Sequence, residues 1–144
     1  MKIVVLPAVA AWLLFAPGPG MADGIQPGLW RITTSVLNNG EPMPPRASLR
    51  CLTTAQAEDV ADTFSPRFGG INTSCERVEY EKSEQKVTWR LICKGQVNMD
   101  SKAEFTFHSP IRYTATIVTK SWIAEQLAME SHVTLEGEFV GVCQ

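Results

Sequence analysis

The stretch that decides the fold is CERVEYEKSEQKVTWRLIC, residues 75–93. Apolar residues recur at every second position on both sides of the polar tip SEQK. Alternation of this kind places apolar side chains on one face of a strand. The stretch therefore predicts a β-hairpin with one face in a core and the other in water. Its apolar positions are Val78, Tyr80, Val87, Trp89 and Leu91.

Cysteines stand at both ends of this hairpin, and the chain has four in all: Cys51, Cys75, Cys93 and Cys143. An even number of cysteines in an exported chain predicts two disulfides. A structural zinc site is the weaker interpretation, because no C-x-x-C pair is present. Three pairings are possible. We favour Cys75 with Cys93, because a hairpin brings its ends together, which leaves Cys51 with Cys143.

The register of the hairpin contains a conflict. Aligning Val78 and Tyr80 with the apolar positions of the second arm leaves Cys75 one residue out of phase with Cys93. Side chains alternate strictly along paired strands. A β-bulge near Cys75 is therefore expected.

The N-terminus has the form of a secretory signal peptide. Lys2 precedes an uncharged run over residues 3–15, and small residues follow at Gly20 and Ala22. This order of segments is typical of a signal peptide, and the run is shorter than the roughly 20 residues of a membrane span. We predict a signal peptide over residues 1–22, cleavage after Ala22 and a periplasmic location.

Removal of residues 1–22 leaves 122 residues, enough for one compact domain, which we place at 23–144. Only Lys2 is lost from the charged residues, so 12 basic and 15 acidic residues remain and the net charge is −3. Nucleic-acid binding requires a basic surface and is not expected. No later run is long and apolar enough to span a membrane, and the sequence predicts no cofactor.

Residues 28–37 alternate and predict a strand, which NNG at 38–40 ends in a tight turn. EPMPP at 41–45 predicts an exposed loop or irregular edge, because proline lacks the N–H that a central strand needs. Residues 47–51 return as a short strand. Residues 53–64 predict one helix, which Thr53 and Gln56 begin with a capping box.

The second half of the chain predicts an antiparallel meander. Alternating segments follow the hairpin at 95–99, 103–108, 112–117 and 129–143, with a turn expected at Asp100-Ser101. Residues 121–132 are ambiguous: their propensity favours a helix, whereas their neighbours favour a hairpin with a turn near 124–126. We expect the hairpin. The predicted fold is mainly β, a single curved or barrel-like antiparallel sheet with one helix after Cys51 and two disulfides.

Candidate catalytic residues are few. The two histidines, His108 and His132, fall on polar faces of strands, and no G-x-S-x-G motif accompanies them. Glu136 and Glu138 stand roughly 6.5–7 Å apart by strand rise, which suits an inverting glycosidase pair. Nothing in the pattern buries one of them to raise its pKa, so solvent exposure is the better interpretation of these two, as it is of Glu104 and Glu125.

Methionine and aromatic residues suggest two kinds of binding. Met43, Met99 and Met129 with His132 could form a soft site for cuprous ion, but methionine as core filler is the better interpretation. Six aromatic residues fall on the inward faces, where they form either a packed core or the lining of a pocket for a small apolar ligand. They are Trp30, Trp89, Phe105, Phe107, Tyr113 and Phe139.

An ordered set of motifs spans almost all of the chain after residue 22. It comprises PGLW at 27–30 with ITT at 32–34, EPMPP at 41–45, CLT at 51–53, VTW at 87–89, Phe107 with Tyr113, and GVC at 141–143, together with the four cysteines. The set resembles a bacterial family of exported proteins, the domain of unknown function 3617. The resemblance implies export and a domain definition and brings no activity.

We therefore expect a non-catalytic envelope protein that binds a small apolar ligand or a partner protein. The alternative is a hydrolase or a copper-handling protein that uses His108, His132 and nearby carboxylates.

Overall fold

The computed structural model describes residues 24–67 and 73–144. The predicted signal peptide, residues 1–22, lies outside the described residues. The described chain consists of strands and two short helices in the order β1 (Gly28–Asn38), β2 (Glu41–Leu52), α1 (Thr54–Glu58), α2 (Val60–Phe64), β3 (Thr73–Lys82), β4 (Lys86–Gly95), β5 (Asn98–Ser109), β6 (Arg112–Ile123) and β7 (Gln126–Gly141).

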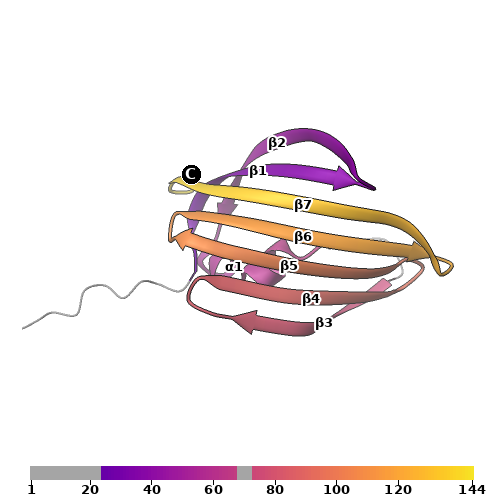
Figure 1. Cartoon of the computed structure of the whole chain (residues 1–144). Helices are drawn as coiled ribbons and strands as arrows, with labels where there is room; N and C mark the ends of the chain where they lie inside the picture. Colours follow the sequence, from indigo (N-terminus) through magenta and orange to yellow (C-terminus); the bar gives the residue numbers. More distant parts are fainter. Residues whose placement is uncertain (1–23, 68–72) are drawn as a thin grey trace, which may run out of the picture.

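All seven strands form one antiparallel sheet in the order β2-β1-β7-β6-β5-β4-β3. Strands β3 to β7 follow one another as the predicted meander, and β1 returns beside β7 with β2 outside it (Figure 1). The prediction of a mainly β, antiparallel fold is confirmed. The sheet is curved and does not close into a barrel, so β2 and β3 are its free edges.

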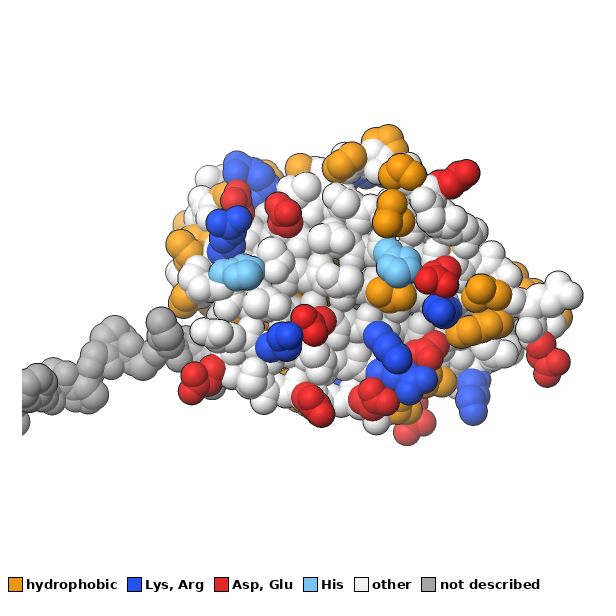
Figure 2. All heavy atoms as spheres, in the orientation of Figure 1, with side chains coloured by type: hydrophobic (Ala, Val, Ile, Leu, Met, Phe, Trp, Pro, Cys, Tyr) orange, Lys and Arg blue, Asp and Glu red, His pale blue; other side chains and the backbone are white. Residues whose placement is uncertain are grey.

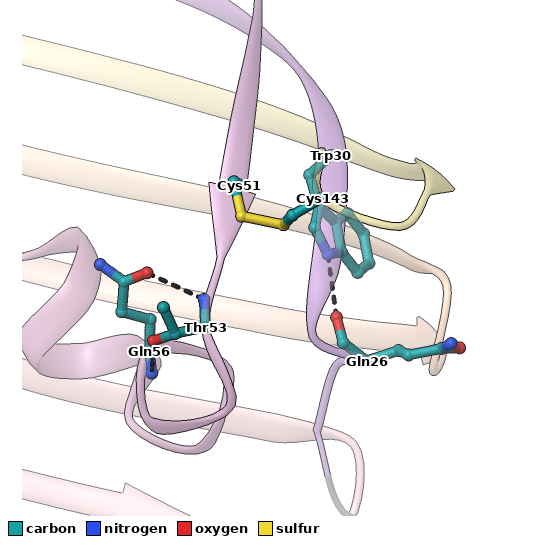
Figure 3. The surroundings of a disulfide bond; sticks show 6 residues. All are labelled: Gln26, Trp30, Cys51, Thr53, Gln56 and Cys143. Carbon is teal, nitrogen blue, oxygen red and sulfur yellow. Dashed lines mark hydrogen bonds between the residues drawn. A yellow bond between two sulfur atoms is a disulfide. The ribbon is translucent and has the colours of Figure 1, made fainter.

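The predicted single helix is instead two helices that meet at Asp59. Thr53 begins α1 with the predicted capping box, since its Oγ1 accepts from Gln56 N at 3.3 Å and Gln56 Oε1 accepts from Thr53 N at 3.0 Å (Figure 3). Asp59 leaves the helical conformation at φ −119° and ψ 77°, and its carboxylate accepts from Asp62 N. The chain restarts there because an aspartate carboxylate caps a new N-terminus.

The helices cover one face of the sheet and enclose the main core with it. We call this side the helix face and the opposite side the open face. The largest fully buried side chains, Trp30, Phe105 and Tyr113, lie on the helix face. Trp30 Nε1 donates to Gln26 O at 2.9 Å, which gives the buried indole a hydrogen-bond partner (Figure 3). Leu52, Ala57, Val60 and Ala61 complete the core from β2 and the helices.

The β3–β4 hairpin contains the expected bulge. Tyr80 stands opposite Trp89, Arg77 opposite Leu91, and the register shifts between Arg77 and Glu79, so Val78 is the extra residue. This shift places Cys75 opposite Cys93, and the two form a disulfide with Cα atoms 4.0 Å apart. The second disulfide joins Cys51 to Cys143, with Cα atoms 5.6 Å apart (Figure 3).

The proline-rich segment 41–45 belongs to a strand rather than a loop. It opens β2, pairs with the end of β1 and is followed by a register shift between Thr34 and Val36. An edge strand tolerates prolines because one of its sides has no ladder partner. The alternative of an irregular edge is therefore the correct one.

The turn expected at Asp100-Ser101 is wrong. Strand β5 begins at Asn98, and the chain reverses at residues 96 and 97, where Asn98 Oδ1 accepts from Gly95 N at 3.2 Å. Polar residues at 100 and 101 resembled a turn, but Ser101 is buried on the helix face and Asp100 pairs with Arg90 on the open face.

Residues 121–132 form the end of β6, a two-residue turn and the start of β7, as their neighbours indicated. The turn residues Ala124 and Glu125 have φ of 49° and 65°. The β1–β2 turn has the same sign of φ at Asn39 and Gly40, residue types that adopt it readily. Ala124 and Glu125 do not, so the β6–β7 turn is strained.

Replacing Ala124 with Asn and Glu125 with Gly is expected to stabilise the protein by about 1–2 kcal/mol, because both new residues accept positive φ. Urea unfolding of the double variant would measure the gain. The matched control is Ser83→Asn with Glu84→Gly in the β3–β4 turn, where no residue has positive φ. An equal gain in the control would contradict the strain.

Candidate functional site

The helices leave the open face of the sheet uncovered. Its side chains alternate with the core residues along each strand and include many charged residues and threonines. Figure 2 shows basic and acidic side chains scattered over this face. Exposed hydrophobic side chains gather near the β1–β2 and β6–β7 turns, on the right of the view (Figure 2). The exposed members from these two hairpins are Leu37, Met43, Ile123, Leu127 and Met129.

A depression of about 810 Å³ lies on this face across four neighbouring strands, β3 to β6. We call it the open-face groove. Its lining is Glu79, Tyr80, Glu81, Thr88, Trp89, Arg90, Lys102, Ala103, Glu104, Thr116 and Val118. Because Trp89 and Ala103 are buried on the helix face, the groove is bounded chiefly by charged residues and threonines.

Arg90 organises the charges of the groove. Its Nε and Nη2 donate to the two carboxylate oxygens of Asp100 at 3.0 and 2.8 Å, and Nη1 donates to Glu79 at 3.1 Å. These hydrogen bonds raise the pKa of Arg90, and those to Asp100 hold the pKa of that carboxyl below its usual value. The bidentate pair fixes the guanidinium geometry at the edge of the groove.

Two charges of the groove have no such partner. Lys86 pairs with Glu104 at 3.0 Å, whereas Lys102 and Glu81 have no ion pair within 4.0 Å among the described residues. Lys102 stands between Arg90 and Val118 in the sheet register. Its ammonium group and the Glu81 carboxylate are therefore available to a bound molecule.

A second depression, of about 420 Å³, lies between the β1–β2 and β6–β7 turns. Val118 of the groove stands opposite His132, which lines the second depression, so the two are neighbours on one face. Asn39 N donates to Glu130 O at 2.8 Å, and Glu130 N donates to Asn39 Oδ1 at 2.9 Å. These bonds hold the two hairpins together. Leu37 and Leu127 form apolar walls.

Residues 25–143 match the family described as protein of unknown function (DUF3617). The chain belongs to this family. The match covers all seven strands and both disulfides of the DUF3617 fold described above. No curated protein and no solved structure matches the chain. The family therefore defines the domain and leaves its activity to be argued from the structure.

The two histidines of this DUF3617 domain both lie on the open face but in different surroundings (Figure 2). His132 Nε2 is 2.8 Å from Glu130 Oε1, and Lys120 Nζ is 3.5 Å from the other oxygen of that carboxylate. The hydrogen bond with His132 lowers the pKa of Glu130. His108 Nε2 is 2.9 Å from Thr114 Oγ1. No hydrogen bond among the described residues joins the two histidine sites.

The predicted carboxylate pair is exposed, in keeping with its solvated interpretation. Glu138 and Glu136 are both open to solvent, and Glu138 lies 3.8 Å from Arg31. Glu104 pairs with Lys86, and Glu125 lies in the strained β6–β7 turn. The structure does not bring the four carboxylates together at one site.

The methionines do not form a metal site with His132. Met99 is buried on the helix face, and Met129 stands opposite the buried Ser121 on that face, whereas His132 is on the open face. Met43 Sδ accepts from Asn38 Nδ2 at 3.1 Å. Among residues 24–67 and 73–144, no group of three or more His, Cys, Asp and Glu residues is arranged to hold a metal ion.

The aromatic residues pack against one another. The Tyr113 ring lies 5.3 Å from Trp30 and 5.2 Å from Phe105, and Phe64 of α2 lies 4.9 Å from Phe105. These rings and the helices fill the helix face. Burial raises the pKa of Tyr113, whose hydroxyl has no hydrogen-bond partner among the described residues.

In the part of the chain that the structure describes, no helix is long and apolar enough to cross a membrane.

Proposed function

We propose that this protein is an exported, periplasmic, non-catalytic domain that binds a partner protein in its open-face groove. The N-terminal sequence has the order of segments of a signal peptide. The four cysteines form two disulfides, which persist in oxidising compartments. Both features support export.

The placement of the aromatic rings favours a partner protein over a small apolar ligand. Trp30, Phe105 and Tyr113 have no exposed surface, so the inward face is filled by protein, which favours the packed core over the apolar-ligand pocket. The large depression lies instead on the open face, where Lys102 and Glu81 offer unpaired charges. A non-obligate interface is only about as apolar as the rest of a protein surface, and available charges can select a partner of complementary charge.

The proposal is tested by photocrosslinking in the native host. A photoreactive phenylalanine derivative at Thr116, an exposed residue of the groove, is expected to form one discrete adduct. Mass spectrometry would identify the adduct, and the purified partner would then be titrated. Lys102→Glu is expected to weaken its binding about tenfold, because like charges at an interface are strongly unfavourable.

Two controls keep the result specific. The same probe at Glu58, exposed on α1, should give no such adduct, and Lys94→Glu, exposed on β4 outside the groove, should leave the affinity unchanged. Equal adducts at both positions, or no adduct at Thr116, would contradict a partner site in the groove. Native mass spectrometry of the protein purified from the periplasm distinguishes a partner protein from a small apolar ligand. A tightly held small ligand would raise the mass slightly above that of the bare chain.

The contact between His132 and Glu130 favours a second candidate, a hydrolase. A carboxylate that orients a histidine is one part of a nucleophilic site. No hydroxyl or thiol of the described residues hydrogen-bonds to His132, however, and Glu130 is shared with Lys120. Hydrolysis of a panel of activated esters that is lost in His132→Gln but kept in His108→Gln would favour this candidate over the binding domain.

A further inference from the structure

Strand β2 is a free edge of the sheet, and its two halves differ. The first half contains Pro42, Pro44 and Pro45, which have no N–H group and so weaken pairing with another strand. Residues 46–51 contain no proline, and all of them except the half-buried Arg50 are exposed. This second half therefore presents unpaired backbone groups along an edge that nothing among the described residues extends.

The opposite edge, β3, is protected in the ways that natural edge strands usually are. It has the bulge at Val78, which interrupts a regular ladder. It also bears charges of both signs that are engaged within the fold, since Glu79 pairs with Arg90 and Arg77 lies 4.0 Å from Asp59. The unprotected half of β2 is thus the better template for an added strand.

The side chains of this half of β2 are basic on one face. Arg46 stands opposite Thr34 and Arg50 opposite Trp30, so both arginines project on the helix face, roughly 13 Å apart by strand rise. No carboxylate of the described residues lies within 4.0 Å of either guanidinium. Arg50 lies over the Phe64 ring at 5.1 Å and donates one bond, at 3.4 Å, to Thr63 O.

The other face of the same half is apolar. Leu49, opposite Arg31 on the open face, has 63% of its surface exposed. Ala47 lies on the same face, opposite Thr33. A strand that paired with β2 would therefore meet two unneutralised cations on one face and an uncovered leucine on the other.

We propose that residues 46–51 of β2 pair with an extended acidic segment of a partner protein, which adds a strand to the sheet. Main-chain hydrogen bonds would supply affinity, and carboxylates four residues apart, facing Arg46 and Arg50, would supply selectivity. Apolar residues between them would cover Leu49. The proposal rests on the proposed function insofar as the occupant is a protein, but it uses an edge of the sheet that is distinct from the groove.

The test uses a fluorescein-labelled peptide, Thr-Glu-Val-Thr-Val-Glu-Thr, and its counterpart with Lys in place of both Glu residues. Fluorescence anisotropy with the folded protein at low ionic strength is expected to show about tenfold tighter binding of the acidic peptide. Arg46→Glu should reverse this preference, because it changes the sign of one facing charge. Arg112→Glu, an exposed charge on β6, is the matched control and should leave the preference unchanged.

Equal affinity for the two peptides, no binding of either, or the same reversal in Arg112→Glu would overturn the proposal. Slower amide exchange at residues 46–51 on binding is also expected, and slowing at β3 instead would overturn it. If the peptide does not bind but the probe at Thr116 forms its adduct, only the proposed β2 site is contradicted. If the peptide binds but the probe forms no adduct, only the proposed partner site in the groove is contradicted.

Discussion

Replacing Gly137 with alanine is expected to destabilise the protein by about 3 kcal/mol, the upper end of the usual cost of overpacking a core. Gly137 is buried in β7 directly opposite Tyr113 of β6. A Cβ atom at this position would overlap atoms of the Tyr113 ring. The ring cannot move aside, because Trp30 and Phe105 pack against it. Urea unfolding of the variant measures the loss.

Gly40→Ala is the matched control for this substitution. Its Cβ would meet no atom within 4 Å, although its φ of +84° disfavours a side chain. We expect a loss of about 1 kcal/mol from the backbone alone. Tyr113→Leu in the Gly137→Ala background should recover part of the stability by shortening the overlapping ring. A loss in Gly137→Ala no greater than that in Gly40→Ala would contradict the steric argument.

The hairpin of residues 75–93 shows how much of the fold the sequence can specify. Alternation located both arms, and the conflict between the cysteines and the apolar positions predicted a bulge near Cys75. The structure has the bulge at Val78, which restores the phase between Tyr80 and Cys75. Val78 itself was expected to face the core and is 47% exposed. The phase conflict between the cysteines and the apolar positions thus predicts that the hairpin has a bulge. It does not predict which residue is the extra one.

Elements that depend on distant partners were harder to predict. The position of β1 between β2 and β7 follows from contacts across most of the chain, which local periodicity does not encode. The prolines of residues 41–45 suggested a loop because their tolerance on an edge depends on that sheet order. The break at Asp59 depends on one carboxylate that caps a second helix within a continuous run of helix formers.

Most of the open-face groove could not be predicted from the sequence. Arg90, Lys102 and Thr116 alternate with apolar residues in the sequence, but alternation does not show that four adjacent strands line one depression. One contact did have a local signal. Glu130 and His132 are two residues apart on one strand, so their side chains share a face and meet at 2.8 Å. Ser131, the sequence neighbour of His132, points to the other face.

Loss of the Cys51–Cys143 disulfide is the second large effect that we expect. The bond closes a segment with a sequence separation of 92, whereas Cys75–Cys93 spans 18. On the chain-entropy account, a cross-link stabilises a protein by restricting its unfolded state, more so for a longer loop. Replacing both Cys51 and Cys143 with alanine is expected to cost about 4.5 kcal/mol, and replacing Cys75 and Cys93 about 3 kcal/mol.

Urea unfolding of the two double variants tests this order, with the fully reduced protein as the reference for loss of both bonds. Burial acts in the opposite direction, because Cys93 is 1% exposed and its truncation leaves a small void, whereas Cys51 and Cys143 are exposed. A larger loss from the Cys75–Cys93 pair would therefore mean that packing of the hairpin outweighs chain entropy. The expected order instead makes the link between β2 and the C-terminal segment the principal covalent constraint on the unfolded chain.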